Sequence, residues 1–206
     1  MIGELRTGPI TSADGSTNLP RSGKGGDLIV SQLHGKYTEA SVRGDLCFSY
    51  CAARATSVPA TAQIGNIIWN PPGSGVVLSM LKWTAQIEVT SATTLGVTIG
   101  YQAQAITPTS VTLANAYGST YLNAGSPGNC IAKAYAIATL LVIPIPVMNL
   151  FHNTAAIATT GVDKIDGDFE GLWTVPPGYV VVLSAITAAV AAAGMTSTLT
   201  WAEIPE

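Results

Sequence analysis

Two stretches of the chain alternate strictly between apolar and polar residues. In residues 82–89 and again in residues 97–102, the apolar side chains occupy every odd position. A period of two predicts β-strands with one buried face and one exposed face. The small residues 91–94 between the two stretches predict a hairpin loop.

Two further segments, residues 131–143 and 180–190, are apolar with few polar interruptions. Such runs predict strands that are covered on both faces. The second run is rich in alanine, so a helix is the alternative there. The rest of the chain from Asp45 onward is rich in Thr, Ala, Val, Ile and Gly, with turn residues at regular intervals, which also predicts strands.

A nine-residue segment occurs twice. Residues 71–79 (PPGSGVVLS) align without gaps on residues 176–184 (PPGYVVVLS), with seven identical positions. Proline fixes φ and glycine adopts positive φ, so each copy predicts a turn that leads into a long strand. The predicted turn residues are Pro71, Pro72, Gly73, Pro176, Pro177 and Gly178.

Each copy is followed by a strand, a turn of small residues and a second strand, which predicts a hairpin. Two such hairpins about a hundred residues apart, in a chain with no convincing amphipathic helix, predict an all-β, two-sheet sandwich over residues 45–206. Among sandwiches we favour a jelly roll, because its two Greek keys accommodate a strand pair that returns late in the chain beside an early one.

Charge is scarce in this chain. Only 10% of the 206 residues are charged, against about 25% in an average protein, and residues 55–162 contain just Lys82, Glu88 and Lys133. A surface with so little charge is poorly suited to bulk water. We therefore expect a homo-oligomer, a dimer or trimer, that also binds a larger partner lattice.

Several classes of function are excluded by the same composition. The net charge is −3 and no cluster of Lys and Arg occurs, so nucleic acid is not an expected partner. The longest apolar run, Ala134 to Met148, is shorter than a membrane span and contains two prolines, and no signal peptide is recognised, so we expect no membrane. Neither His34 nor His152 belongs to a catalytic or metal-binding pattern, and we expect neither an enzyme nor a cofactor.

Residues 1–44 are rich in glycine and predict an extended N-terminal arm that adds contacts to a neighbouring subunit. Its charged and aromatic side chains are the predicted partner-binding residues. They are Arg21, Lys24, His34, Lys36, Tyr37 and Arg43.

Two other features carry chemistry. The acidic segment 163–170 offers Asp163, Asp166 and Asp168 as weak candidates for a cation, but its alternation with apolar residues favours a charged strand without a metal. The three cysteines are odd in number and lack a CxxC spacing, so we expect buried thiols in a protein made in a reducing compartment.

Both ends of the chain resemble a known group of proteins. The segments GGDLIVSQLHGKYTE (25–39), DGDFE (166–170), VPPG (175–178) and WAEIP (201–205) are similar to those of small virion structural proteins from tailed bacteriophages. The resemblance implies a capsid-associated β-sandwich and transfers no active site.

The resemblance implies a decoration or cement protein that binds the major capsid protein at the capsid surface after synthesis in the host cytoplasm. The alternative is a tail or head-fibre component that acts as a receptor- or carbohydrate-binding module. Exposed aromatic side chains would favour that alternative, although the positions of the aromatics favour core packing. The aromatics concerned are Trp69, Trp83, Trp173, Tyr179 and Trp201.

Overall fold

The computed structural model describes residues 37, 46–51, 57–87, 95–113, 115–118, 130–153, 163–186 and 195–206. The chain divides into two units, Met1–Thr38 and Glu39–Glu206. The fold described below is that of the second unit.

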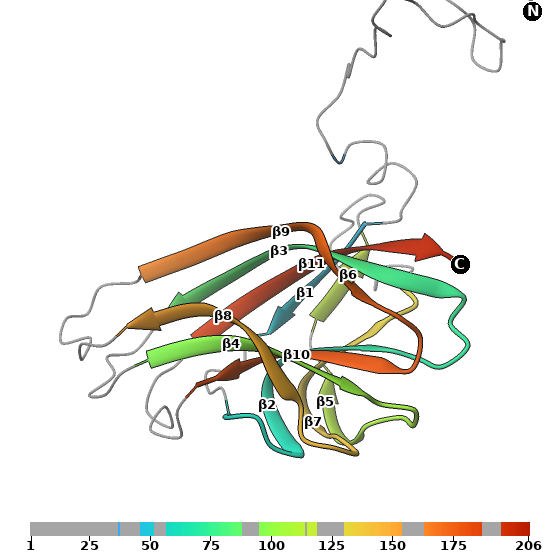
Figure 1. Ribbon diagram of the computed structural model, residues 1–206, viewed down its shortest axis with the longest axis horizontal. Coiled ribbons are helices and arrows are strands. Elements are labelled where there is room, and N and C mark those ends of the chain that lie inside the picture. The colour runs from blue at the N-terminus through green and yellow to red at the C-terminus, as the bar shows by residue number, and fades with distance from the viewer. Residues whose placement is uncertain are drawn as a thin grey trace, which may run out of the picture. The chain divides into compact units, whose positions relative to one another are not determined.

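The described residues of this unit form eleven strands in two sheets, and every strand pair is antiparallel. The two sheets pack face to face (Figure 1), which confirms the predicted all-β, two-sheet sandwich. In spatial order, the five-stranded sheet contains β6 (Asn115–Gly118), β1 (Leu46–Cys51), β11 (Met195–Pro205), β3 (Val76–Ile87) and β9 (Asp163–Val175). The six-stranded sheet contains β5 (Thr109–Leu113), β7 (Lys133–Thr139), β2 (Ala62–Asn70), β10 (Tyr179–Ala185), β4 (Leu95–Ala103) and β8 (Ile145–Asn153).

Early strands pair with late strands in reverse order. β1 pairs with β11, β2 with β10, β3 with β9 and β4 with β8. Along the chain, β1 to β4 alternate between the two sheets, and β8 to β11 return through the same sheets in the opposite order. The eight strands therefore form one long antiparallel double strand that is folded back and forth between the sheets.

The repeated Pro-Pro-Gly segments lie at matching places in this double strand. Residues 71–75 connect β2 to β3, and residues 176–178 connect β9 to β10, so both turns pass from one sheet to the other. Gly73 and Gly178 have φ of 70° and 79°. Each turn leads into a strand, β3 or β10, but the hairpin predicted to follow each turn is wrong, because β3 and β4, like β10 and β11, belong to different sheets. Residues 91–94, the predicted hairpin loop, lie outside the described residues.

Asn70 holds the two turns together. Its side-chain Nδ2 donates to the backbone carbonyl oxygens of Val76 at 2.8 Å and Val175 at 3.0 Å. The backbone carbonyl of Asn70 accepts from the Gly178 N–H at 2.8 Å. One buried amide thus links the ends of β2 and β9 to the start of β3. The two turns are therefore neighbours in the folded protein, joined through Asn70.

The main core lies between the sheets and follows the alternation read from the sequence. In β3, Trp83 and Ala85 are buried while Lys82 and Thr84 are half-buried. In β4, by contrast, all residues from 96 to 100 are buried, although a half-buried strand was expected. The outer face of this strand is therefore covered by another part of the chain.

The segment between β4 and β8 supplies that cover and adds three strands. β5 and β7 extend the six-stranded sheet beyond β2, and β6 extends the five-stranded sheet beyond β1. β5 is an edge strand whose five residues are all exposed. The chain then crosses from β7, at one side of the sheet, to β8 at the opposite edge (Figure 1).

Candidate functional site

The two sheets differ sharply in charge. In the five-stranded sheet, β9 alone carries five charged residues between 163 and 170. The six strands of the other sheet contain one charged residue, Lys133. The sandwich therefore has one side with charges and one side that is almost free of them.

The outer face of the six-stranded sheet has an apolar cluster of its own. Its members alternate with residues of the main core: Ile67 and Trp69 flank Ile68 in β2, and Val180 and Val182 flank Val181 in β10. The complete cluster is Ile67, Trp69, Tyr135, Ala138, Leu140, Val180 and Val182. All are buried, so the central strands are covered on both faces, as predicted for residues 180–185.

Two segments lie over this outer cluster, and we call them together the flap: residues 104–108, which follow β4, and residues 140–147, which lead from β7 into the first three residues of β8. The buried apolar residues of the flap are Pro108, Leu140, which belongs to the cluster, and Pro144. A Cβ added to Gly100 would lie 3.0 Å from both Pro144 Cβ and Val182 Cγ2. A side chain at Gly100 would therefore push these neighbours by a few tenths of an ångström, which shows that the flap lies directly on the sheet.

Gln104 fixes both segments of the flap. Its side-chain Nε2 donates to the Ile106 carbonyl at 2.7 Å, and its Oε1 accepts from the Leu141 N–H at 2.8 Å. Its backbone N–H donates to the Gly178 carbonyl at 2.6 Å, and its backbone carbonyl accepts from Trp69 Nε1 at 2.8 Å. Gln104 is only 1% exposed, and its hydrogen bonds connect the flap to β2 and to the second Pro-Pro-Gly turn.

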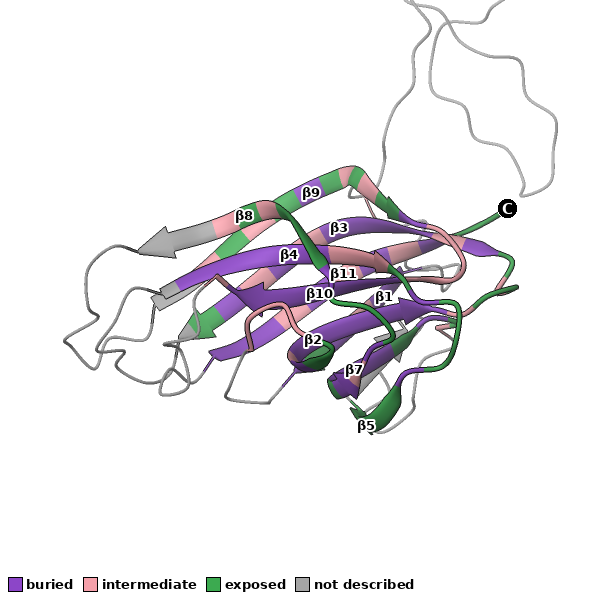
Figure 2. Ribbon diagram, turned by 60° about the horizontal axis from the view of Figure 1, so that its bottom comes forward, coloured by how far each residue is buried: buried purple, intermediate pink, exposed green. Residues whose placement is uncertain are grey.

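The opposite side of the flap is apolar and exposed. Figure 2 shows exposed residues over this side of the six-stranded sheet and along β5. The exposed flap residues are Ile106, Leu141, Val142, Ile143, Ile145 and Val147. Of the thirteen large apolar side chains that are exposed in the described part of the chain, ten lie between residues 106 and 147. A run of exposed apolar residues is unfavourable in a lone soluble domain and marks an interaction surface.

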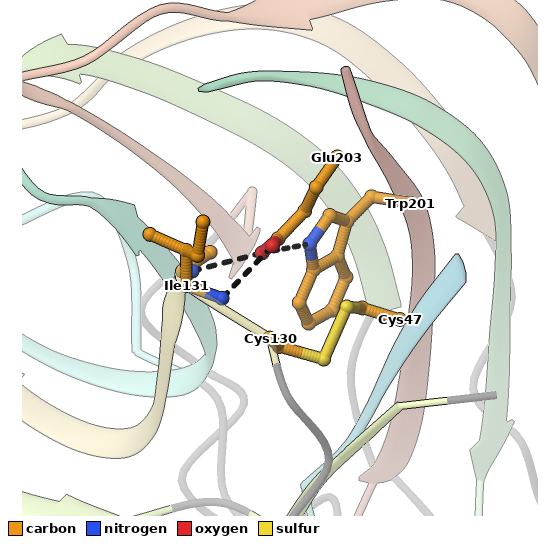
Figure 3. The surroundings of a disulfide bond; sticks show 6 residues. Cys47, Cys130, Ile131, Trp201 and Glu203 are labelled. Carbon is orange, nitrogen blue, oxygen red and sulfur yellow. Dashed lines mark hydrogen bonds between the residues drawn. A yellow bond between two sulfur atoms is a disulfide. The ribbon is translucent and has the colours of Figure 1, made fainter. Parts of the chain in front are cut away.

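A covalent link anchors the other end of β7. Cys47 in β1 and Cys130, three residues before β7, form a disulfide bond. Beside it, Glu203 accepts hydrogen bonds from the N–H groups of Ile131 at 2.8 Å and Ala132 at 2.9 Å (Figure 3). The expectation of unpaired thiols is therefore wrong for Cys47 and Cys130, and Cys51 is the buried thiol that remains outside the bond.

The donor atoms of Cys47, Cys130 and Glu203 lie within 4.8 Å of one another, a spacing that suits a metal ion. The chemistry of the donors does not fit one. Both sulfur atoms are joined in the disulfide, and both carboxylate oxygens accept hydrogen bonds, including one from Trp201 Nε1 at 3.3 Å. The cluster acts as a structural link between β7 and the five-stranded sheet.

The predicted partner-binding residues Arg21, Lys24, His34, Lys36 and Arg43 lie outside the described residues. Tyr37 is described and is half-buried in a turn.

The acidic residues predicted as weak cation ligands lie in the edge strand β9. Lys82, in the neighbouring strand β3, places its Nζ 3.3 Å from an oxygen of Asp166 and 3.9 Å from an oxygen of Asp168. The segment is thus the charged strand that the alternation favoured, and its charges protect a sheet edge.

The aromatic residues contribute mainly to the core. Trp69, Trp83 and Trp201 are buried, and Trp173 and Tyr179 are half-buried. The Tyr179 ring stacks on Tyr101 with 5.1 Å between ring centroids. An array of exposed rings, which carbohydrate binding would favour, is not formed by these residues.

Sequence reasoning missed the flap. Residues 141–143 belonged to a segment predicted to be covered on both faces, yet all three are exposed. The prolines at 144 and 146 were the available signal, because proline interrupts a central strand and leaves the chain free to cross the sheet. Nothing in the sequence singled out Gln104.

No family model, no curated protein and no solved structure matches this chain. In the part of the chain that the structure describes, no helix is long and apolar enough to span a membrane.

Proposed function

We propose that the chain is a non-enzymatic structural protein of a bacteriophage virion, a decoration or cement protein that binds and stabilises the lattice of the major capsid protein. The observation that supports this most directly is the flap, an exposed apolar surface without charge, which is typical of a subunit that works within a larger assembly. The polar groups at Glu203 and Lys82 are engaged in structural hydrogen bonds and ion pairs, which is consistent with a protein that binds without catalysis.

The order of strand pairing supports the finer fold assignment that this proposal uses. A double strand whose first four strands pair in reverse order with its last four is the arrangement of a jelly roll, and β5, β6 and β7 are then an insertion between its two halves. Jelly rolls are frequent in viral capsid proteins.

In the proposed mechanism, the sandwich sits over junctions between capsid subunits and holds neighbours together by burying apolar surface. Residues 1–44 supply the polar contacts that set its register, with Arg21, Lys24, His34, Lys36, Tyr37 and Arg43 as contact residues. The protein acts as a homo-oligomer at the capsid surface and needs no cofactor.

The test uses heads of the encoding bacteriophage prepared without this protein. Purified chain added to such heads should bind in hundreds of copies per head and raise the temperature at which they release DNA. A chain that lacks residues 1–44 should remain folded and fail to bind. Normal occupancy by the shortened chain would refute the role of the arm, and a dozen copies or fewer per virion would indicate a tail component instead.

The alternative, a receptor- or carbohydrate-binding module on a tail or head fibre, would depend on the stacked pair Tyr101 and Tyr179, because three of the four tryptophans are buried. Binding of the isolated protein to a glycan array would favour it. A Tyr179→Ala variant that lost this binding would place the sugar at the stacked pair.

A further inference from the structure

We infer that the flap is the surface through which two copies of this chain associate around a two-fold axis. This inference rests on the proposed function, which includes a homo-oligomer. It adds the surface through which the copies meet and the symmetry of the contact.

The first argument is charge. Residues 104–108 and 140–147 contain no charged side chain, and neither β4 nor β8 beside them contains Asp, Glu, Lys or Arg. A two-fold axis places a patch against its own copy, so any charge near the axis faces a like charge. A charge-free patch meets this requirement, whereas it offers nothing to attract an oppositely charged partner.

The second argument is the kind of apolar residue. The exposed large side chains of the flap are Ile, Leu and Val, and its sequence contains no Tyr, Trp, Met or Arg. Surfaces that recruit a separate partner are typically enriched in those four residues. Interfaces between permanent copies resemble a domain core cut in half, which is the composition found here.

The third argument is the exposure and order of the surface. Its six large apolar side chains are each between 40% and 61% exposed, which is unfavourable in a lone domain and is relieved when a second copy covers the patch. Gln104 holds both segments, and Pro144 is seated over Gly100. The surface is therefore already ordered, which lowers the entropy lost on association.

The test is analytical ultracentrifugation of the full chain across a concentration series. The wild-type protein should sediment as a dimer, at twice the chain mass of 21.1 kDa. The Ile143→Asp variant places a charge in the centre of the flap and should weaken dimerisation by at least roughly 100-fold. Leu172→Asp is the matched control, because Leu172 is also exposed, at 76%, but lies in β9 of the other sheet, so this variant should remain a dimer.

A second variant and a second measurement guard against misfolding. Gly100→Ala keeps every exposed flap side chain but adds a Cβ 3.0 Å from Pro144 Cβ and Val182 Cγ2, so the flap must shift by a few tenths of an ångström; this variant should weaken the dimer while circular dichroism stays that of the wild type. In the unmodified protein, hydrogen exchange at residues 141–147 should slow as concentration rises.

A wild-type chain that stays monomeric at its highest soluble concentration, or an Ile143→Asp variant that dimerises normally, would overturn the inference. The two proposals fail separately. A monomer that still binds heads would refute the flap dimer and leave the decoration function in place, whereas a flap dimer that binds no heads would do the reverse.

Discussion

The indole N–H of Trp69 donates a hydrogen bond of 2.8 Å to the backbone carbonyl of Gln104. Both residues are buried, and the bond joins a central strand of the six-stranded sheet to the first residue of the flap. A buried indole N–H requires an acceptor, so the tryptophan and the flap satisfy each other. Buried hydrogen bonds of Gln104 therefore hold the flap on the sheet, with its apolar side chains on the exposed side.

Removing the Gln104 side chain should loosen the flap. In Gln104→Ala, the Ile106 carbonyl and the Leu141 N–H lose their partners, and we expect unfolding in denaturant to require about 1–3 kcal/mol less free energy. Gln102, two residues earlier and within β4, is the matched control because it is half-buried, and Gln102→Ala should change stability by less than about 0.5 kcal/mol. Equal effects of the two substitutions would show that the Gln104 side chain does not hold the flap.

The disulfide should be a major contributor to stability. It joins residues separated by 83 positions, and a cross-link of that span is worth about 4–5 kcal/mol in the chain-entropy model. Reductant should therefore lower the denaturation midpoint of the wild type and of Cys51→Ser, but not that of Cys130→Ser. Titration of thiols in the unfolded, unreduced chain should find one, and three would contradict the bond.

Glu203→Gln should weaken the anchor at the start of β7. The carboxylate accepts from two backbone N–H groups and from Trp201, whereas an amide has one acceptor oxygen and turns an NH₂ group toward other donors. Loss of one charge-assisted hydrogen bond predicts a destabilisation of about 1.5–3 kcal/mol in denaturant unfolding. Glu206→Gln, which changes an exposed residue three positions later, is the control and should be neutral. A Glu203→Gln variant as stable as this control would show that the carboxylate is not needed.

The sequence was sufficient for the fold class because burial in a sandwich follows the period of two. Trp83 and Ala85 are buried where the alternation places them. The destination of each turn was not predictable: a Pro-Pro-Gly turn has the same local requirements in a hairpin as between two sheets. In the folded protein, the Asn70 side chain donates to the Val175 carbonyl across 105 positions of the chain, a contact that no local pattern shows.

The flap was beyond sequence reasoning for a similar reason. Leu140 and Leu141 are identical in type and adjacent, yet one is 3% exposed and the other 55%. Which of them faces the sheet depends on Gln104 and Gly100, residues that are distant in sequence. Composition nevertheless carried part of the answer, since the charge-poor region between residues 55 and 162 contains the whole flap.

Alkaline pH should destabilise the sandwich through its tyrosines. Burial raises the pKa of Tyr135 above its ordinary 10.0, and burial together with the neighbouring Tyr179 raises the pKa of Tyr101. Below pH 10 both hydroxyls are protonated in the folded and unfolded states, and the full stability is present. As the pH rises further, the unfolded chain loses these protons first, so the free energy of unfolding falls until the folded pKa values are passed. Denaturant unfolding between about pH 9 and pH 12 should show this loss, and the double variant Tyr101→Phe/Tyr135→Phe should show a smaller one. An equal slope in wild type and variant would contradict the assignment, because these buried hydroxyls would then not be the groups whose ionisation opposes folding.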